Sequence, residues 1–199
     1  MAEGGETGSS RRKRTSGRSP SVFQLKVTLR RSKPPIWRRI QVGSDIRLPS
    51  LHDVLQVVMG WEDSHLHQFI VNDSHYGLPD PDIEIQDERD VSLGQVVSKV
   101  NDRLIYEYDF GDSWEHELLV EKILPLNEEN RSPVCLAGKG ACPPEDCGGI
   151  WGYEDLLKAV RDPKHPEHKE MMRWVGSEFD PDAFDLTMVN KVLYGGGAV

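Results

Sequence analysis

The chain has 199 residues, of which 37% are hydrophobic and 29% are charged, and its formal net charge is −9. This length supports one hydrophobic core and not two, and the apolar content is too high for a chain that is disordered throughout. No run of residues approaches the ~20 apolar positions needed to cross a bilayer, and the polar N-terminus lacks the apolar segment of a secretory signal. We therefore expect a cytoplasmic protein with no membrane contact.

Residues 1–20 combine Gly, Ser and Thr with five basic side chains, four of them in the run Arg11-Arg12-Lys13-Arg14. This composition predicts a disordered basic leader, followed by a single domain over residues 21–199. The run could instead serve as a localisation signal or a nucleic-acid-binding tail. Because the rest of the chain after residue 49 is strongly acidic, we expect only weak, non-specific nucleic-acid contact, through residues 11–18.

The first half of the domain alternates strands with a helix. Residues 22–30 alternate apolar and polar side chains, which predicts a half-buried strand, and residues 36–42 predict its returning partner, with Arg38 and Arg39 on an open basic face. Ser50 resembles the N-cap of an amphipathic helix that ends near Gly60. Residues 66–71 predict a further strand that sends His65 and His67 to one face. A polar loop then runs to about residue 90, and a short helix follows over residues 92–100.

The segment 104–124 predicts a hairpin. Large apolar residues occupy even positions on both sides of Gly111-Asp112-Ser113, which favours a three-residue loop with Phe110 opposite Trp114 and Tyr108 opposite His116. Five carboxylates then share the other face: Glu107, Asp109, Glu115, Glu117 and Glu121. This array is typical of a solvated sheet face, and an ion or partner site is the alternative.

Helical spacing marks the last third of the chain. It predicts helices over residues 153–160, over residues 166–176, and from an N-cap at Asp180 onward. Strands first and helices last indicate an α+β fold, with a mainly antiparallel sheet, helices packed on one side, and a helical C-terminal third.

Three blocks are more elaborate than patterning alone requires: residues 60–69, residues 106–116, and residues 141–149 with Gly152 and Tyr153. Together, from about residue 22 to residue 193, they resemble the plasmid pRiA4b ORF-3-like family, which is sometimes associated with transposon passenger genes. The segment Phe179-Asp180-Pro181, with Phe184 and Asn190, is similar to the family's closing helix. The resemblance implies an α+β domain without an established biochemical activity and suggests an association with mobile genetic elements.

Three cysteines, Cys135, Cys142 and Cys147, fall within thirteen positions. An odd number cannot pair fully in disulfides within one chain. Structural zinc is one interpretation, although the spacing is looser than in familiar zinc clips. The alternatives are buried thiols that pack as small hydrophobic groups, and a reactive thiol.

The histidines also allow two interpretations. His116 in an aromatic cluster is typical of a hydrogen-bonded core residue. Alternatively, His65, His67 or His116 could join Asp109 or Asp112 around a divalent ion that activates water, as in a hydrolase or nuclease. The sequence contains no Gly-rich phosphate loop, G-x-S-x-G elbow or H-E-x-x-H pair.

The preferred hypothesis is a non-enzymatic binding or accessory domain for an unknown protein or small-molecule ligand. The alternatives are a metal-dependent hydrolase or nuclease, and a nucleic-acid-associated regulator that uses the basic leader. We also expect the Gly111-Asp112 turn and the loop from residue 142 to residue 149 to pack together as one site. The candidate ligand or partner residues are Trp61, His65, His67, Tyr108, Asp109, Asp112, Trp114, His116, Glu145, Asp146 and Tyr153.

Overall fold

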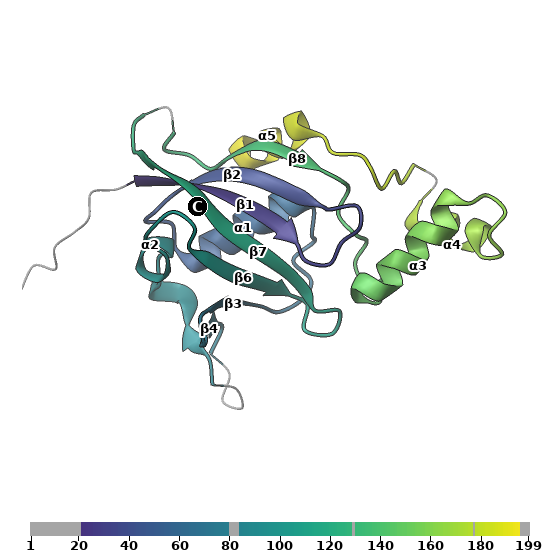
Figure 1. Ribbon diagram of the computed structural model, residues 1–199, viewed down its shortest axis with the longest axis horizontal. Coiled ribbons are helices and arrows are strands. Elements are labelled where there is room, and N and C mark those ends of the chain that lie inside the picture. Colours follow the sequence, from purple (N-terminus) through teal and green to yellow (C-terminus); the bar gives the residue numbers. More distant parts are fainter. Residues whose placement is uncertain (1–20, 80–83, 129, 177, 196–199) are drawn as a thin grey trace, which may run out of the picture.

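The computed structural model describes residues 21–79, 84–128, 130–176 and 178–195. The predicted leader at residues 1–20 lies outside these residues. Within them, strands form one eight-stranded sheet in the order β5-β4-β3-β6-β7-β1-β2-β8 (Figure 1). All neighbouring pairs are antiparallel except β4 and β5. The strands are β1 (Ser21–Leu29), β2 (Trp37–Gly43), β3 (His67–Val71), β4 (Ser74–Gly77), β5 (Gln86–Asp87), β6 (Arg103–Tyr108), β7 (Trp114–Pro125) and β8 (Val134–Lys139).

Helices cover one face of this sheet and extend past its end (Figure 1). They are α1 (Leu48–Met59), the 3-10 helix η1 (Glu88–Asp90), α2 (Leu93–Val96), α3 (Gly149–Arg161), α4 (His168–Val175) and α5 (Leu186–Gly195). The α+β class with a mainly antiparallel sheet is confirmed. No helix among the described residues combines the length and the apolar character that a membrane span requires.

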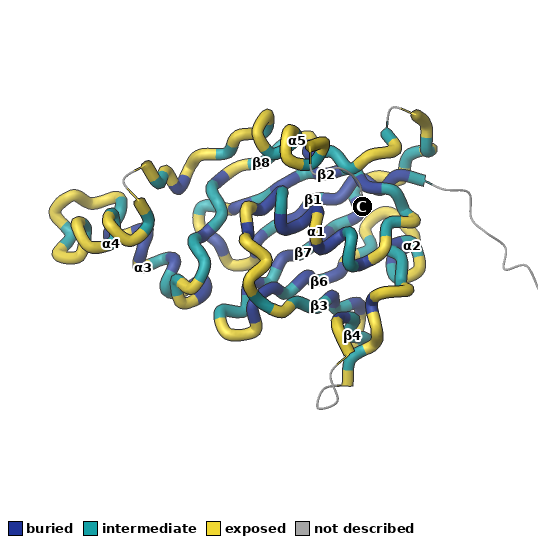
Figure 2. Tube along the Cα trace, turned by 180° about the vertical axis from the view of Figure 1, so that it is seen from behind, coloured by how far each residue is buried: buried dark blue, intermediate teal, exposed yellow. Residues whose placement is uncertain are grey.

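The core lies between the sheet and α1, and Figure 2 shows the buried residues running along the central strands of the sheet. Alternation along the strands turns Leu25, Val27 and Tyr106 toward Leu51 and Leu55 of the helix, and all five are fully buried. The helix begins three residues earlier than predicted, because Pro49 suits its first turn, and its N-cap is Arg47 and not Ser50. It ends as predicted at Gly60, whose φ of 102° is the left-handed conformation that glycine adopts without strain.

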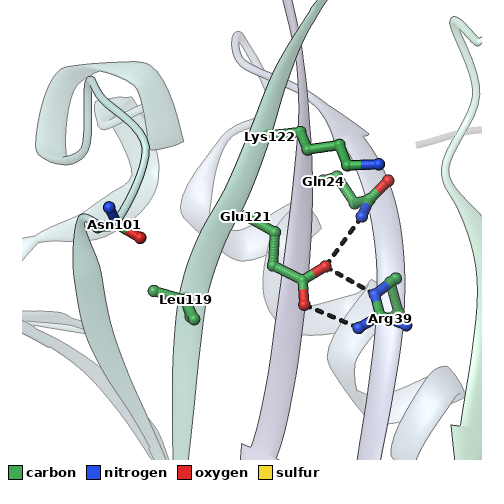
Figure 3. Close-up of a pocket in the computed structure, with 6 residues that line it drawn as sticks. All are labelled: Gln24, Arg39, Asn101, Leu119, Glu121 and Lys122. Carbon is green, nitrogen blue, oxygen red and sulfur yellow. Dashed lines mark hydrogen bonds and ion pairs between the residues drawn. The ribbon is translucent and has the colours of Figure 1, made fainter.

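The opposite face of the sheet is open and polar. A hollow of about 550 Å³ on this face is lined by Gln24, Arg39, Asn101, Leu119, Glu121 and Lys122 (Figure 3). Arg39 and Glu121 form an ion pair in this hollow, with Arg39 Nε 2.6 Å from Glu121 Oε2. The guanidinium of Arg39 lowers the pKa of Glu121 to about 2.

The sequence analysis places Arg38 on the open face of the sheet, and this prediction is wrong. Arg38 lies on the core face, where it is 1% exposed. Its Nε donates to Val58 O at 2.6 Å, and its terminal nitrogens donate to Lys139 O at 3.0 Å and Gly140 O at 2.9 Å. Phe184 lies 4.2 Å from the guanidinium carbon, measured to the ring centroid. The buried charge is thus satisfied by carbonyls at the C-terminus of α1 and at the end of β8. These carbonyls are distant in sequence, so no local pattern reveals that they surround Arg38.

The predicted register of the β6–β7 hairpin is wrong by two residues. Tyr108 pairs with Trp114, and the loop has five residues instead of three. The cause is the left-handed φ of 57° at Asp109, whose Oδ1 accepts the backbone N–H of Gly111 at 2.9 Å. This local turn leaves Phe110 outside the ladder and 41% exposed, and it takes Asp109 off the solvated face.

Several elements differ from the sequence analysis. The segment expected to be a loop before residue 90 contains β4 and β5, and β8 was not predicted. The helix predicted over residues 92–100 is only the four-residue α2. The last helix begins at Leu186, because Asp185 caps it by accepting Met188 N at 2.9 Å, whereas Asp180 lies in a preceding turn. The predicted helices that became α3 and α4 are present.

Candidate functional site

Three loops meet at one end of the sheet, and we call them the site loops: residues 60–66 after α1, residues 109–113 between β6 and β7, and residues 141–149 before α3. The N–H of Asp109 donates to Leu66 O at 2.9 Å, which joins the second loop to the first. The N–H of Gly148 donates to Asp112 Oδ2 at 3.2 Å, which joins the third loop to the second. The predicted packing of the second site loop against the third site loop is therefore confirmed.

Glycines allow this close approach. Gly149 has a φ of 66°, and a Cβ at this position would lie 2.5 Å from Asp112 O. At Gly152, a Cβ would lie 1.8 Å from Cys147 O. Any larger residue would push the third loop away from the hairpin or away from α3.

His65 lies at the centre of the three loops. Its Nε2 is buried and makes no hydrogen bond among the described residues. Three carboxylate oxygens surround this atom, at 3.4 Å for Asp146 Oδ1, 3.5 Å for Glu145 Oε2 and 3.7 Å for Asp109 Oδ2. One ligand atom each from His65, Asp109 and Asp146 lies within 4.8 Å of the others. These three side chains could therefore hold a metal ion.

The two aspartates reach His65 in different ways. The side chain of Asp109 is 8% exposed, and its Oδ1 is occupied by backbone N–H groups, which leaves Oδ2 facing the imidazole. Asp146 has a left-handed φ of 56°, and its side chain is 76% exposed. The site is thus closed on the Asp109 side and open to solvent on the Asp146 side.

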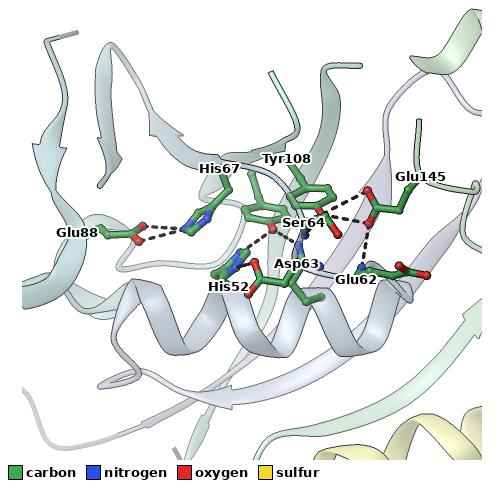
Figure 4. A network of polar contacts seen from close by, with 10 residues as sticks. His52, Glu62, Asp63, Ser64, His67, Glu88, Tyr108 and Glu145 are labelled. Carbon is green, nitrogen blue, oxygen red and sulfur yellow. Dashed lines mark hydrogen bonds and ion pairs between the residues drawn. The ribbon is translucent and has the colours of Figure 1, made fainter. Parts of the chain in front are cut away.

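Glu145 ties the third loop to the first (Figure 4). Its Oε1 accepts the N–H of Glu62 at 2.9 Å and the hydroxyl of Tyr108 at 3.1 Å. The same Tyr108 hydroxyl accepts the N–H of Ser64 at 2.9 Å. Burial, with a further contribution from the Glu145 carboxylate, raises the pKa of Tyr108 to about 12, so this hydroxyl stays protonated and keeps its bond to the loop.

An aromatic floor lies beneath the loops. Trp61 and Trp114 pack with ring centroids 5.3 Å apart, and both are buried. His116 is fully buried, and its Nε2 accepts from Trp61 Nε1 at 3.3 Å. Burial lowers the pKa of His116 to about 4, so it is neutral near pH 7. His116 is therefore a hydrogen-bonded core residue and does not face the site.

Comparisons with known proteins identify the family. The sequence profile of the plasmid pRiA4b ORF-3-like proteins matches residues 21–188. The chain belongs to this family. It is 43% identical over 178 residues to the uncharacterised protein y4hQ of Sinorhizobium fredii, covering 87% of this chain and 91% of that protein.

A solved structure is also similar. It is a protein of unknown function from Methanosarcina mazei Go1, MM3350, with a TM-score of 0.78 and 38% identity, covering 86% of this chain and 98% of that one. The pRiA4b ORF-3-like fold is thus present over nearly the whole described domain. Neither relative carries an established activity in its description.

The side chain of His67 does not lie in the same site as that of His65. His65 precedes β3, so the alternation of side chains along this strand does not include it. His67 Nε2 lies 3.1 Å from Oε1 of Glu88, and its ring stacks on His52 with centroids 3.6 Å apart. His52 in turn bonds to Asp63 Oδ1 at 2.9 Å (Figure 4). Sequence reasoning missed this buried network because its members come from four separate segments, and only Asp63 belongs to a site loop.

The three cysteines do not form a cluster of metal ligands in the part of the chain that the structure describes. Cys135 lies in β8, where its thiol contacts Ala137 O at 3.6 Å, while Cys142 and Cys147 lie in the third site loop. Burial raises the pKa of all three thiols, that of Cys147 to about 12. They pack as the small hydrophobic groups that the sequence analysis kept as an alternative.

Apolar side chains at the rim were not predicted as site residues. Leu66 is 57% exposed, Phe110 is 41% exposed and Trp151 is 70% exposed. Leu66 follows His65, Phe110 follows Asp109, and Trp151 comes two residues after Gly149. Each site loop therefore carries or adjoins one large exposed apolar side chain. The predicted site residue Tyr153 is 2% exposed and belongs to the core beneath α3.

Proposed function

We propose that this chain is a non-enzymatic binding domain whose site loops receive a basic segment of a partner protein. The observation that carries the proposal is the chemistry of the rim. It combines exposed apolar side chains with carboxylates that form no ion pair with an arginine or lysine of the described residues. Solvent-exposed apolar groups beside a polar centre are typical of interaction surfaces.

The charge of the site favours a cationic partner. The site loops contain six carboxylates: Glu62, Asp63, Asp109, Asp112, Glu145 and Asp146. Among the described residues, no lysine or arginine forms an ion pair with any of them, and their ion-pair partners are two histidines, His65 and His52. Elsewhere in the domain, carboxylates such as Glu115 and Glu121 are paired with arginines. A partner with lysine or arginine side chains would supply the missing charge.

The apolar rim supplies a second contribution. Full burial of a large apolar side chain contributes about 1.5–3 kcal/mol. Trp151 is the most exposed large apolar side chain of the described domain, and an exposed tryptophan is a common anchor at interfaces. We therefore expect a partner segment with apolar side chains between its basic residues.

Fluorescence polarisation with short labelled peptides tests the proposal. The probe alternates lysine and leucine, and two comparison peptides alternate lysine with serine and glutamate with leucine. We expect the Lys/Leu probe to bind best, with an affinity that falls as salt rises, because the charge pairs are partly exposed. Measurements in EDTA keep adventitious metal out of the assay.

Two substitutions then locate the surface. Trp151→Ser should weaken binding of the Lys/Leu probe about tenfold or more, as expected from losing one apolar anchor. Trp174→Ser is the matched control, because Trp174 is also exposed, at 50%, but lies on α4 away from the site loops. Equal losses in the two variants, or preference for the Glu/Leu peptide, would refute the proposal.

The alternatives from the sequence have weaker support. The basic first hairpin offers few free charges for phosphates, since Arg30 and Arg31 both pair with Glu115, and Arg38 is buried. A hydrolase would have to work with His65 alone, because His67 and His116 are engaged elsewhere. A cytoplasmic location is part of the proposal, and the three unpaired cysteines fit a reducing compartment. An association with mobile elements rests on the family resemblance alone.

A further inference from the structure

We infer that the site binds one divalent zinc-class metal ion, with His65 Nε2, Asp109 Oδ2 and Asp146 Oδ1 as its ligands. The inference deepens the proposed function, on whose site loops it rests, by adding an ion at their centre. No ligand of this ion is a cysteine, which distinguishes it from the zinc site that the sequence suggested.

The distances around His65 carry the argument. A hydrogen bond from an imidazole nitrogen to a carboxylate oxygen is ~2.8 Å long, and His65 makes none. Ligand atoms that lie ~2.1 Å from one tetrahedral zinc ion lie ~3.4 Å from each other. The separations from His65 Nε2 to Asp146 Oδ1 and Asp109 Oδ2, 3.4 and 3.7 Å, agree with common ligation and are too long for direct bonding.

Two of the three ligand side chains, Asp109 and His65, are also held in place by other contacts. Backbone N–H groups of Gly111 and Asp112 fix Oδ1 of Asp109, so that Oδ2 remains for the ion. The ring of His65 packs edge-on against Tyr108, with centroids 5.9 Å apart. Preformed ligands of this kind bind metal without reorganising a loop.

The third ligand leaves the site open. Because the Asp146 side chain is 76% exposed, a fourth position faces solvent and can take water or a side chain of the partner. One imidazole with two carboxylates is a donor set that suits zinc, and also manganese or iron. The two separations from His65 Nε2, 3.4 and 3.7 Å, fit tetrahedral zinc among these.

Zinc binding to metal-stripped protein tests the inference, with zinc chloride as the titrant and a competing chromophoric chelator as the readout. We expect one equivalent to bind tightly. His65→Gln and Asp146→Asn should each weaken binding by at least ~100-fold, since losing a ligand costs more than losing an outer contact. Asp146 is exposed, so its substitution should not disturb folding. His75→Gln is the control, because His75 lies on β4 and bonds to Gln68.

Two further measurements separate this site from the thiols. Cobalt(II) loaded in place of zinc should show no thiolate charge-transfer band, and Cys147→Ser should leave zinc affinity unchanged. A charge-transfer band, or loss of zinc in Cys147→Ser but not in His65→Gln, would overturn the inference.

The metal and peptide measurements can fail separately. If zinc does not bind but the Lys/Leu peptide still binds in EDTA, the metal inference is wrong and the binding surface stands. If zinc binds with the expected pattern but no basic peptide does, the metal site stands and the proposed partner is wrong.

Discussion

Replacing Arg38 with methionine should destabilise the domain strongly, although Arg38 touches no ligand. Its side chain holds together the C-terminus of α1, through Val58 O, and the end of β8, through Lys139 O and Gly140 O. Methionine has a similar length and no donor, so these three carbonyls would lose their partners.

The magnitude follows from these contacts. A buried carbonyl left without a partner costs about 1–3 kcal/mol, and three of them would cost about 3–9 kcal/mol. Removing the buried charge recovers part of this, since burial also lowers the pKa of Arg38 and so works against its charged form. We expect a net loss of about 3–5 kcal/mol in the free energy of unfolding, as for other buried charges whose network is broken. For a chain of 199 residues this corresponds to a fall in Tm of about 6–20 °C.

Chemical denaturation of wild type, Arg38→Met and Arg39→Met provides the assay. Arg39 is the matched control, because it neighbours Arg38 on β2 but pairs with Glu121 on the open face. A surface pair of this kind contributes up to about 1 kcal/mol. If the two variants lose similar stability, the buried carbonyl network is not what holds α1 to the end of β8, and the reasoning fails.

Three further predictions concern other single positions. Asn190→Leu removes both side-chain hydrogen bonds to the backbone of Cys135, to its N–H at 2.9 Å and to its carbonyl at 2.8 Å. We expect the free energy of unfolding to fall by about 1–3 kcal/mol in thermal melts. Light scattering should show more aggregation, because the edge of β8 opens. His116→Gln should flatten the pH dependence of the free energy of unfolding below pH ~6.5. In the native state the pKa of His116 is about 4, below its ordinary value, so the unfolded state binds the proton first. The wild type therefore loses stability as pH falls from ~6.5 to ~4. An unchanged slope in this window would contradict the burial argument. Gly149→Ala should destabilise the fold more than Gly176→Ala, because both glycines have positive φ but a Cβ at Gly176 meets open space; equal losses would mean that the close approach is not needed.

Much of the sheet could be predicted from the sequence, because alternation is a local signal. The strands around Leu25, Ile40 and Leu118 follow from it, and so does the end of α1 at Gly60. Strand β8 could not be predicted in the same way, because its pairing with β2 depends on a distant partner and it contains Gly138. Charge was misleading at Arg38, whose inward position is stabilised only by carbonyls distant in sequence.

The site was predictable as a group of segments but not as a geometry. Composition marked the second and third site loops, and rigid turns do bring them together. The hairpin register failed, because side-chain bonds of Asp109 to its own loop outweighed the apolar alternation. The prediction that His65 and His67 share one face was wrong. Strand β3 begins at His67, so the alternation of a strand does not extend to His65. The apolar rim left no periodic signal at all.

Hydrogen–deuterium exchange of the domain with and without the Lys/Leu peptide tests the proposed binding surface most directly. We predict that the bound peptide slows exchange in the three site loops, residues 60–66, 109–113 and 141–149, and in the first turn of α3 around Trp151. The α4 helix and the open face of the sheet should exchange at unchanged rates. Protection centred on α4 or on the hollow beside Arg39, with none in the site loops, would contradict the assignment of these loops as the binding surface.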